Sequence, residues 1–414
     1  MKVSYFHKFK FAKKIKQMNS KDWKAFLILV LSFLPGKILK IFHPNIWVIS
    51  EYEMMARDNG YWFYKYIREN HPEVEAYYPL NYDSPDYPKI EILGNCIVFG
   101  GFYHYCLFWA AKIYCSSASV QGFPYPRICE DIVLSNFHSF KYIFLNHGIT
   151  RGYSYIVNNQ NTNYNLLCVC SEFDKNIIIK ENGQSDEIVK VTGYARHDNL
   201  DNEILDNSLI LIMPTWRTWL SYRNEISKIK IQEKIEAFLH SKYYRFYSEL
   251  INNEELIGFL EENNLNIIFY LHQYAQPFAD YFSSVSDRIE VGRSSKFDVQ
   301  TLLKKASLLI TDYSSVCYDY AYMFKPVLYY QFDINEFESK QYGCGKMFSY
   351  FENGLGDVCF NINDLINCVK LLSENKFSMP DKYKERVKNY FAYCDKNNCK
   401  RIFETILDLT DNDR

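Results

Sequence analysis

The stretch LLITDYSSVCYDYAYMFKPVLYY, residues 308–330, is the part of the chain from which the fold can be inferred. It opens with a short apolar run, Leu308–Thr311, and closes with another, Val327–Tyr330. Between them lie the polar turn Asp312–Ser315 and a helix-compatible segment, Val316–Phe324, which a Lys-Pro pair ends. The order strand, tight turn, helix, strand is the repeating unit of a parallel α/β sheet.

The turn Asp312–Ser315 is suited to binding an anion. It follows the carboxyl end of a predicted strand and precedes a predicted helix, where backbone N–H groups lack partners and the helix dipole is positive. Ser314 and Ser315 add two hydroxyl donors. The alternative is that Asp312 or Ser314 only caps the helix. The turn by itself does not decide between a phosphate site and an ordinary cap.

The composition excludes several classes of protein. A chain of 414 residues predicts two domains of ordinary size, and 48% hydrophobic residues exclude a disordered chain. The net charge of −2 does not indicate a nucleic-acid-binding protein. The 12 cysteines form no CxxC pair, so we interpret them as buried thiols in a reducing compartment.

Residues 1–45 are predicted to associate with a membrane surface. Residues 1–40 hold ten lysines and one acidic residue, Asp22, and a ten-residue apolar run, Ala25–Leu34, ends at Pro35-Gly36. Ten apolar residues cannot span a bilayer, which needs about 20. A basic segment with aromatic residues can lie on an anionic leaflet. The alternative is a helix of the protein core that is preceded by a basic segment exposed to solvent. No cleavage site follows the run, so we expect no signal peptide.

The remaining chain reads as two α/β domains, residues 46–205 and 206–372, followed by a helical tail, residues 373–414, packing across both. Apolar runs predict strands at residues 46–50, 74–78, 97–99, 113–115, 142–145, 166–169, 188–192, 209–213 and 266–271, besides 308–311 and 327–330. Helices are predicted at residues 60–70, 171–180, 232–239, 254–263, 298–305, 316–324, 364–373 and within 380–409. The alternation predicts two Rossmann-like domains facing each other across a cleft.

A histidine follows one predicted strand in each domain. His147 comes after the strand at residues 142–145 and is followed by Gly148, and His272 comes after the strand at residues 266–271. Ligands of open α/β sheets bind at the carboxyl ends of the strands. A histidine there can act as a base near neutral pH. The alternative for each is a loop histidine without a chemical role.

Six motifs, in this order, resemble the CDP-glycerol glycerophosphotransferases of teichoic acid and capsule synthesis. They span most of residues 46–405 and are HGITRG (147–152), TGYARHDNL (192–200), MPTWR (213–217), YLHQ (270–273), ITDYSSVCYDYAYMFKPVLYYQFD (310–333) and DKNNCKRIFE (395–404). The resemblance implies a GT-B-like fold and peripheral attachment to the cytoplasmic face of the bacterial membrane. It also implies transfer of glycerol phosphate, or a related alditol phosphate, from a CDP donor to a lipid-linked or polysaccharide acceptor.

The resemblance also assigns roles to residues. It implies that His147 is the general base and that His272 approaches the donor's phosphates. Ser314 and Ser315 are expected at the pyrophosphate. The other residues expected around the substrates are Arg151, Arg196, Asp198, Thr215, Arg217, Thr311 and Asp312.

Two departures from the family pattern leave the donor and acceptor open. Arg151 stands where many relatives have lysine, and His272-Gln273 stands where many have a His-Pro pair. No metal-ligand cluster is visible, although a pyrophosphate can bring Mg²⁺ with few protein ligands. Two other functions compete: a nucleotide-sugar glycosyltransferase of GT-B architecture, which would release a nucleoside diphosphate, and a membrane-surface scaffold without activity.

Overall fold

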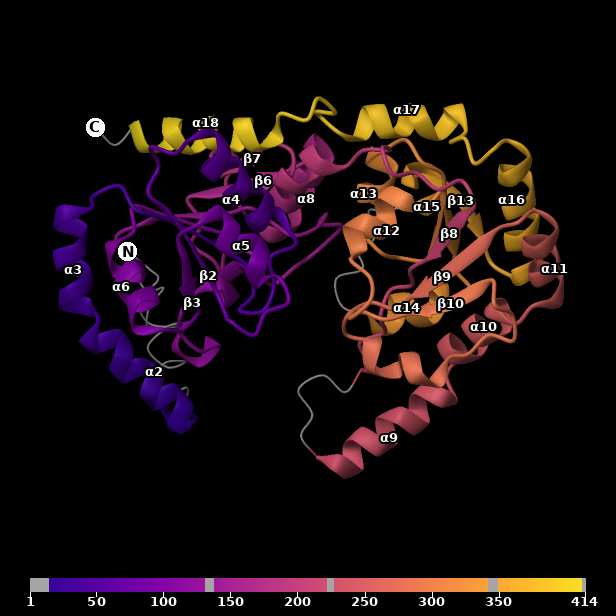
Figure 1. Ribbon diagram of the computed structural model, residues 1–414, viewed down its shortest axis with the longest axis horizontal. Coiled ribbons are helices and arrows are strands. Elements are labelled where there is room, and N and C mark those ends of the chain that lie inside the picture. The colour runs from indigo at the N-terminus through magenta and orange to yellow at the C-terminus, as the bar shows by residue number, and fades with distance from the viewer. Residues whose placement is uncertain (1–14, 131–137, 222–226, 342–348, 412–414) are drawn as a thin grey trace. The chain divides into compact units, whose positions relative to one another are not determined.

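The computed structural model describes residues 15–130, 138–221, 227–341 and 349–411 (Figure 1). The chain forms two compact units. Unit 1 comprises Met1–Thr150, Ser154–Asn199 and Asp395–Arg414, and unit 2 comprises Arg151–Tyr153 and Leu200–Cys394. Unit 1 is therefore discontinuous in sequence. The predicted domain boundary at residues 205/206 lies slightly beyond the structural one at Asn199.

Unit 1 is built on a parallel sheet. Among the described residues it has seven strands in the order β3-β2-β1-β4-β5-β6-β7, and every pairing is parallel. The strand order reverses between β1 and β4, which is where open α/β sheets bind ligands. The strands are β1 (Trp47–Ser50), β2 (Ala76–Leu80), β3 (Cys96–Val98), β4 (Ile113–Ser116), β5 (Lys141–Phe144), β6 (Leu166–Val169) and β7 (Val189–Val191).

Both faces of this sheet are buried. On β1, Val48 belongs to one hydrophobic cluster and Ile49 to another, because successive strand residues point to opposite faces. The cluster of Val48 includes residues of α2, α6 and α8, and the cluster of Ile49 includes residues of α4 and α18. The helices of unit 1 are α2 (Ser20–Leu31), α3 (Phe33–Phe42), α4 (Asn59–Asn70), α5 (Tyr87–Leu93), α6 (Phe102–Ala110), α8 (Glu172–Asn182) and α18 (Asn398–Asp411), with 3₁₀ helices η1 (Ser119–Gly122), η2 (Arg127–Cys129) and η3 (Ala195–Asn199).

The N-terminal segment folds as the two helices α2 and α3. Asn19 and Asp22 form a capping box at the start of α2. Pro35-Gly36, which follow the apolar run, lie inside α3, since proline is tolerated in a first helical turn. Gly36 packs against α6: a Cβ there would lie 2.6 Å from Trp109 Cβ.

The membrane-spanning potential of this segment is limited. Within the described part of the chain, no single helix is long and apolar enough to cross a membrane. The helices α2 and α3, bent by 42° at their junction, are long and apolar enough to cross a membrane only when they are taken together. The lysines at positions 8, 10, 13 and 14, on which part of the membrane prediction rests, lie outside the described residues.

Unit 2 repeats the architecture. Its described residues form a six-stranded, all-parallel sheet in the order β10-β9-β8-β11-β12-β13, and the strand order reverses between β8 and β11. The strands are β8 (Leu209–Ile212), β9 (Asn266–Tyr270), β10 (Ile289–Gly292), β11 (Leu308–Thr311), β12 (Val327–Tyr330) and β13 (Gly356–Cys359). The helices are α9 (Lys228–Leu239), α10 (Lys242–Ile251), α11 (Glu254–Glu262), α12 (Val299–Lys305), α13 (Val316–Tyr322), α14 (Ile334–Lys340), α15 (Tyr350–Asn353), α16 (Ile362–Glu374) and α17 (Asp381–Tyr390), with the 3₁₀ helix η4 (Gln276–Tyr281).

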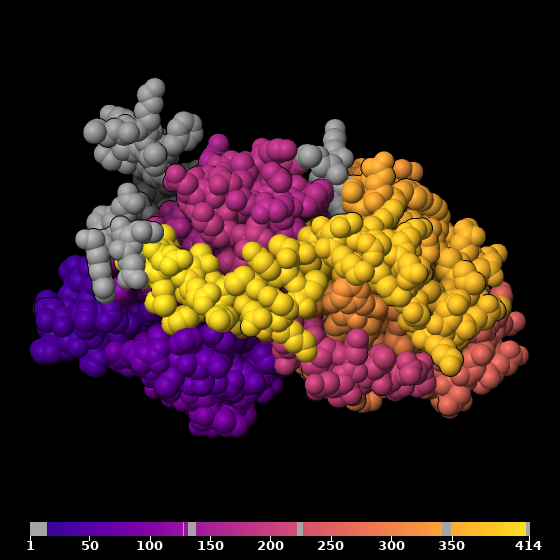
Figure 2. Space-filling view, turned by 90° about the horizontal axis from the view of Figure 1, so that it is seen from above, coloured from indigo at the N-terminus to yellow at the C-terminus, as the bar shows by residue number. Residues whose placement is uncertain are grey.

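The two Rossmann-like halves confirm the predicted fold class, and all the predicted strands are present. One prediction of a helix needs correction. Residues 218–246, in which one helix was predicted at residues 232–239, also contain the start of α10, whose Tyr243 and Tyr247 are buried. The tail contains helices as predicted, with α17 in unit 2 and α18 in unit 1. In Figure 2, the yellow C-terminal end of the chain, which forms α18, lies against the indigo N-terminal part of unit 1.

Candidate active site

His147 lies in the loop after β5, at the carboxyl edge of the unit 1 sheet. Asn146, in the left-handed conformation with φ 60°, accepts the His147 N–H with its side-chain oxygen at 2.9 Å. The ring Nδ1 of His147 is 3.1 Å from the carbonyl oxygen of Ser117. A carbonyl oxygen can only accept, so Nδ1 carries the proton of the neutral ring and Nε2 keeps a lone pair. The neutral ring is thus oriented as a base at Nε2.

The surroundings of His147 favour this neutral form. Burial of the ring lowers the pKa of His147, and Asp58 and the Ser117 carbonyl oppose that effect, while Arg196 adds to it. The residue as a whole is exposed to solvent. A lower pKa means that His147 is deprotonated, and able to accept a proton, at neutral pH.

Arg196 and Asp198, predicted around the substrates, are bonded within unit 1. The Arg196 guanidinium is 2.7 Å from Asp58 Oδ1, and its residue is only 8% exposed. Asp198 accepts the backbone N–H groups of Asn398 and Cys399 at 2.9 and 2.7 Å, at the start of α18. Asp198 therefore caps the N-terminus of α18.

The TDYSS turn of unit 2 separates into buried and accessible residues. Thr311 Oγ1 donates to the Met213 carbonyl at 2.6 Å, and both Thr311 and Asp312 are fully buried. Ser314 and Ser315 are partly exposed. Ser314 Oγ accepts the Val316 N–H at 3.3 Å, whereas the Ser315 hydroxyl makes no hydrogen bond among the described residues. Of the four residues, the two serines are the ones that can meet a ligand.

Asp312 does not cap α13. Its Oδ1 accepts the Thr215 N–H at 2.8 Å, and its Oδ2 accepts the Tyr247 hydroxyl at 3.2 Å. The Oδ2 atom also lies 2.9 Å from Arg217. The capping alternative for Asp312 is therefore wrong: this carboxylate joins the carboxyl ends of β8 and β11.

Arg217 is a buried structural cation. Its side chain is 0% exposed, and its Nε is 2.9 Å from Asp333 Oδ2. Burial disfavours the charge, but Asp312 and Asp333 outweigh it and raise the pKa of Arg217. The rings of Tyr243, Tyr313 and Phe337 surround the guanidinium at 4.9–5.2 Å. Such a group is enclosed by protein and is not presented to a donor.

Thr215 is better placed to meet a ligand than Arg217. Its Oγ1 is buried and has no hydrogen-bond partner among the described residues. This leaves the hydroxyl able to donate a hydrogen bond to a ligand. Thr215 follows β8, the strand that pairs with β11 at the reversal point of this sheet.

His272, just after β9, has the opposite hydrogen-bonding state to His147. Its Nδ1 accepts the Tyr274 N–H at 3.2 Å, so Nε2 carries the proton of the neutral ring. Trp216 stacks on the imidazole, with ring centroids 6.0 Å apart and planes at 20°. His272 is thus oriented as a hydrogen-bond donor, which suits an anionic ligand.

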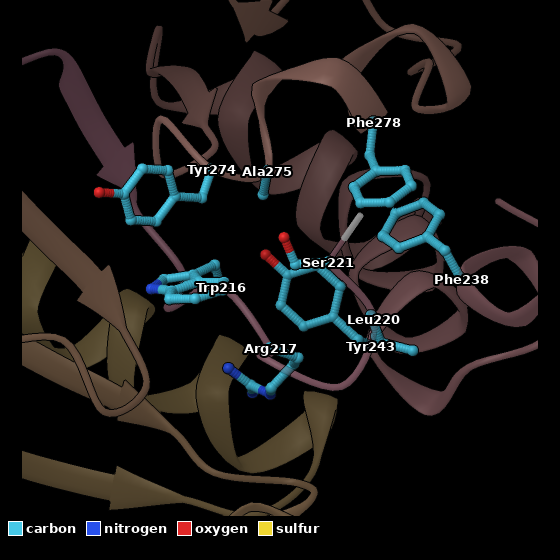
Figure 3. A pocket seen from close by; sticks show the side chains of 9 residues that line it. All are labelled: Trp216, Arg217, Leu220, Ser221, Phe238, Tyr243, Tyr274, Ala275 and Phe278. Atoms are coloured by element: carbon cyan, nitrogen blue, oxygen red, sulfur yellow. The ribbon is translucent and has the colours of Figure 1, made fainter. Parts of the chain in front are cut away.

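Figure 3 shows a small cavity beside this stack, between Trp216, Tyr243, Tyr274 and Phe278. Its volume is about 10 Å³, which is close to the minimum for one water molecule. The Tyr243 hydroxyl has no hydrogen-bond partner among the described residues. The cavity is therefore a water-sized gap, too small for a nucleotide.

Arg151 and Lys325 also contact protein groups. Arg151 donates to the Tyr350 hydroxyl and to the Tyr313 carbonyl. Lys325, of the Lys-Pro pair, donates to the carbonyls of Leu303, Lys304 and Ala306 at 2.7–2.8 Å. The lysine thus closes the C-terminal end of α12.

The structure adds residues that the sequence did not single out. Asp333 pairs with Arg217, Asp58 pairs with Arg196, and Asn59 donates to the carbonyls of Leu145 and Asn146 at 3.2 and 2.8 Å. No local pattern marks these partners. Within the described residues, no group of three or more His, Cys, Asp or Glu side chains could hold a metal ion.

The family model of the CDP-Glycerol:Poly(glycerophosphate) glycerophosphotransferases matches residues 37–408. The chain belongs to this family. The chain is 31% identical to the minor teichoic acid biosynthesis protein GgaB of Bacillus subtilis (strain 168), over 99% of the chain and 45% of that protein. It is 24% identical to the teichoic acid poly(glycerol phosphate) polymerase of the same organism, over 77% of the chain and 42% of that protein.

Solved structures support the fold of this family member. The wall teichoic acid polymerase TagF superposes with a TM-score of 0.66 at 18% identity, over 100% of this chain and 99% of that one. At such low identity the likeness establishes the GT-B-like fold alone. The chain spans less than half the length of the two B. subtilis proteins.

Proposed function

We propose that the protein transfers glycerol phosphate, or a related alditol phosphate, from CDP-glycerol to a hydroxyl of a lipid-linked or polymer acceptor in teichoic acid or capsule synthesis, releasing CMP. The observation that carries the proposal is the opposite hydrogen bonding of the two histidines. The proton of the neutral His147 ring lies on Nδ1, which leaves a lone pair on Nε2, whereas the proton of the neutral His272 ring lies on Nε2. A base and an anion-binding donor are what this reaction requires.

The chemistry uses these groups as follows. The acceptor oxygen attacks the phosphorus that carries the glycerol, while His147 Nε2 takes the hydroxyl proton. The bond from that phosphorus to the bridging oxygen breaks, and CMP leaves with that oxygen. General-base assistance of this kind contributes roughly 10²–10⁴-fold.

In this proposal, residues of unit 2 bind the negatively charged phosphates of the donor. The hydrogen-bond donors in this scheme are His272, Ser314, Ser315 and the Thr215 hydroxyl, which has no partner among the described residues. Donors held in position provide most of the stabilisation in phosphoryl transfer. Arg217 and Asp312 hold the turn that carries the serines and make no substrate contact in this scheme. A Mg²⁺ ion carried by the pyrophosphate is part of the proposal, with its ligands supplied mainly by the phosphates.

The test is a panel of CDP-alditols incubated with the full chain and a synthetic lipid-linked acceptor ending in glycerol phosphate, with products identified by mass spectrometry. The expected result is CMP and an acceptor one alditol phosphate heavier. His147→Ala should lose most turnover and still bind CDP-glycerol. Release of CDP or UDP from a nucleotide sugar would instead support a glycosyltransferase, and turnover of any CDP-alditol eliminates the scaffold alternative.

We also propose that α2 and α3 attach the protein to the cytoplasmic face of the membrane. Large apolar side chains are exposed on these helices: Leu34 is 66% exposed, and Ile41 and Phe42 are each 75% exposed. Lys37 and Lys40 lie among them. Exposed apolar groups beside lysines fit an anionic lipid surface, where a lipid-linked acceptor would also be found.

A further inference from the structure

The loop that carries His147 is bonded to a buried carboxylate on α8. Asp174, in the first turn of α8, is fully buried. Its Oδ1 accepts the Thr150 N–H at 3.1 Å, and its Oδ2 accepts the Tyr194 hydroxyl at 3.0 Å. The Asp174 side chain therefore fixes the loop three residues after His147.

Tyr194 bonds the same loop at a second atom. Its hydroxyl also lies 3.0 Å from the Gly148 carbonyl oxygen, directly after His147, and the residue is fully buried. The Tyr194 proton is thus shared between Gly148 and Asp174. Because Asp174 is out of water, losing the bond from Tyr194 leaves one of its buried oxygens unpaired.

The other end of α8 bonds the chain again. Asn182, also fully buried, accepts the Ser154 N–H at 2.7 Å. Asp174 and Asn182 lie eight residues apart on one helix, so α8 fixes the chain on both sides of Arg151–Tyr153. On the other side of His147, Asn59 donates to the Leu145 and Asn146 carbonyls.

We infer that Asp174 and Tyr194 are positioning residues for the base His147, acting through the backbone of Gly148 and Thr150. Among the described residues, neither is hydrogen-bonded to the imidazole, whose Nδ1 donates to the Ser117 carbonyl. Their role is to keep the backbone that carries His147 in one conformation, so that Nε2 meets the acceptor hydroxyl. A displacement of about 1 Å at a reacting group can cost about 100-fold in rate.

This inference rests on the proposed function, and the test separates the two. The variants are Tyr194→Phe, which keeps the ring and removes the hydroxyl, and Asp174→Asn, which keeps an acceptor for Thr150. Tyr64→Phe is the matched control, because Tyr64 is a fully buried tyrosine of unit 1 whose hydroxyl donates to the Gly94 carbonyl at 2.5 Å. Each variant is measured in the full chain.

The kinetic readout is the rate of CMP release. Tyr194→Phe and Asp174→Asn are expected to lower kcat about 10- to 100-fold, with the KM for CDP-glycerol little changed, because the donor is bound by unit 2. Tyr64→Phe should keep the wild-type kcat. In the His147→Ala background, the same two substitutions should cause no further loss, because they act through His147. A loss of the same size with and without His147 would overturn the inference.

Hydrogen exchange supplies a readout that does not depend on activity. The peptide containing Gly148 and Thr150 should exchange faster in Tyr194→Phe and Asp174→Asn than in the wild type or in Tyr64→Phe. If the wild type releases no CMP from any CDP-alditol, the proposed function fails. Hydrogen exchange then still tests whether Asp174 and Tyr194 hold the backbone of Gly148 and Thr150. Unchanged exchange in both variants would overturn that contact as well.

Discussion

The guanidinium of Arg217 lies between two carboxylates and three aromatic rings, with no exposed surface. Removing one partner of a buried ion pair leaves the other charged and unsolvated. Arg217→Met should therefore destabilise the protein by about 3–5 kcal/mol, because Asp312 and Asp333 both lose their cation. The measurement is the free energy of unfolding in denaturant.

A matched control for that substitution is Arg245→Ala. The Arg245 side chain is 62% exposed and lies 3.9 Å from Glu249. Exposed pairs of this kind contribute about 0–1 kcal/mol. If Arg217→Met cost no more than the control, the structural role given to Arg217 would be wrong.

The pH dependence of turnover follows from His147. The pKa of His147 is lowered below its ordinary value near 6.5, so the base form persists into mildly acidic solution. As pH falls through that lowered pKa, Nε2 gains a proton and kcat/KM falls. We expect an acidic limb with an apparent pKa below 6.5, absent from the residual activity of His147→Ala. An apparent pKa well above this value would contradict the assigned surroundings of the ring.

The position of a residue at the edge of a sheet could be predicted from the sequence where the neighbouring residues indicate it. His147 and His272 stand directly after apolar runs, and in parallel sheets that position alone brings a side chain to the ligand-binding edge. The role of Arg217 could not be predicted, because its partner Asp333 is 116 residues away. Thr311 was expected near the substrate, but its hydroxyl donates to the Met213 carbonyl. The register of a strand in its sheet determines the face toward which each side chain points.

At the scale of elements, strands that are short and continuously apolar were predictable. Strands β10 and β13 each contain a charged residue and were not predicted. Helix α10 was not predicted either, since its buried face is made of tyrosines, Tyr243 and Tyr247, among charged residues. The segment Arg196-His197-Asp198, expected near the substrates, has a structural role at this scale. Its aspartate is the N-terminal cap of a helix that begins 200 residues later in the chain.

The capping role of Asp198 can be measured. Asp198→Ala should cost about 1 kcal/mol, because the N–H groups of Asn398 and Cys399 lose their acceptor. Hydrogen exchange along α18 should quicken in the same variant. Glu404→Ala, at a 56% exposed side chain on the same helix, should change stability by less than about 0.5 kcal/mol. Equal effects of the two substitutions would argue against the cap.

At the scale of the whole molecule, the predicted membrane attachment can be tested by vesicle flotation. The full chain should float with vesicles containing anionic phosphatidylglycerol and less with neutral ones. Added salt should weaken binding, because each lysine near an anionic surface contributes about 1 kcal/mol that salt screens. A double variant, Ile41→Asp with Phe42→Asp, should stay in the soluble fraction.

Val285→Asp is the control for that experiment. Val285 is 85% exposed, as an isolated apolar residue of unit 2. This variant should float like the wild type. Loss of flotation in both proteins would show that the exposed residues of α2 and α3 are not the attachment surface.

The placement of α18 has a consequence for the nascent chain. Cys399, Ile402, Phe403 and Ile406 of this helix complete a hydrophobic cluster with Trp47 and Ile49 of β1. The ribosome must therefore make Leu200–Cys394 before unit 1 can be completed. At about 5–20 residues per second, that interval lasts roughly 10–40 s. During it, one face of the first sheet lacks its last helix, so the order of synthesis lets the second half of the protein finish folding before the first.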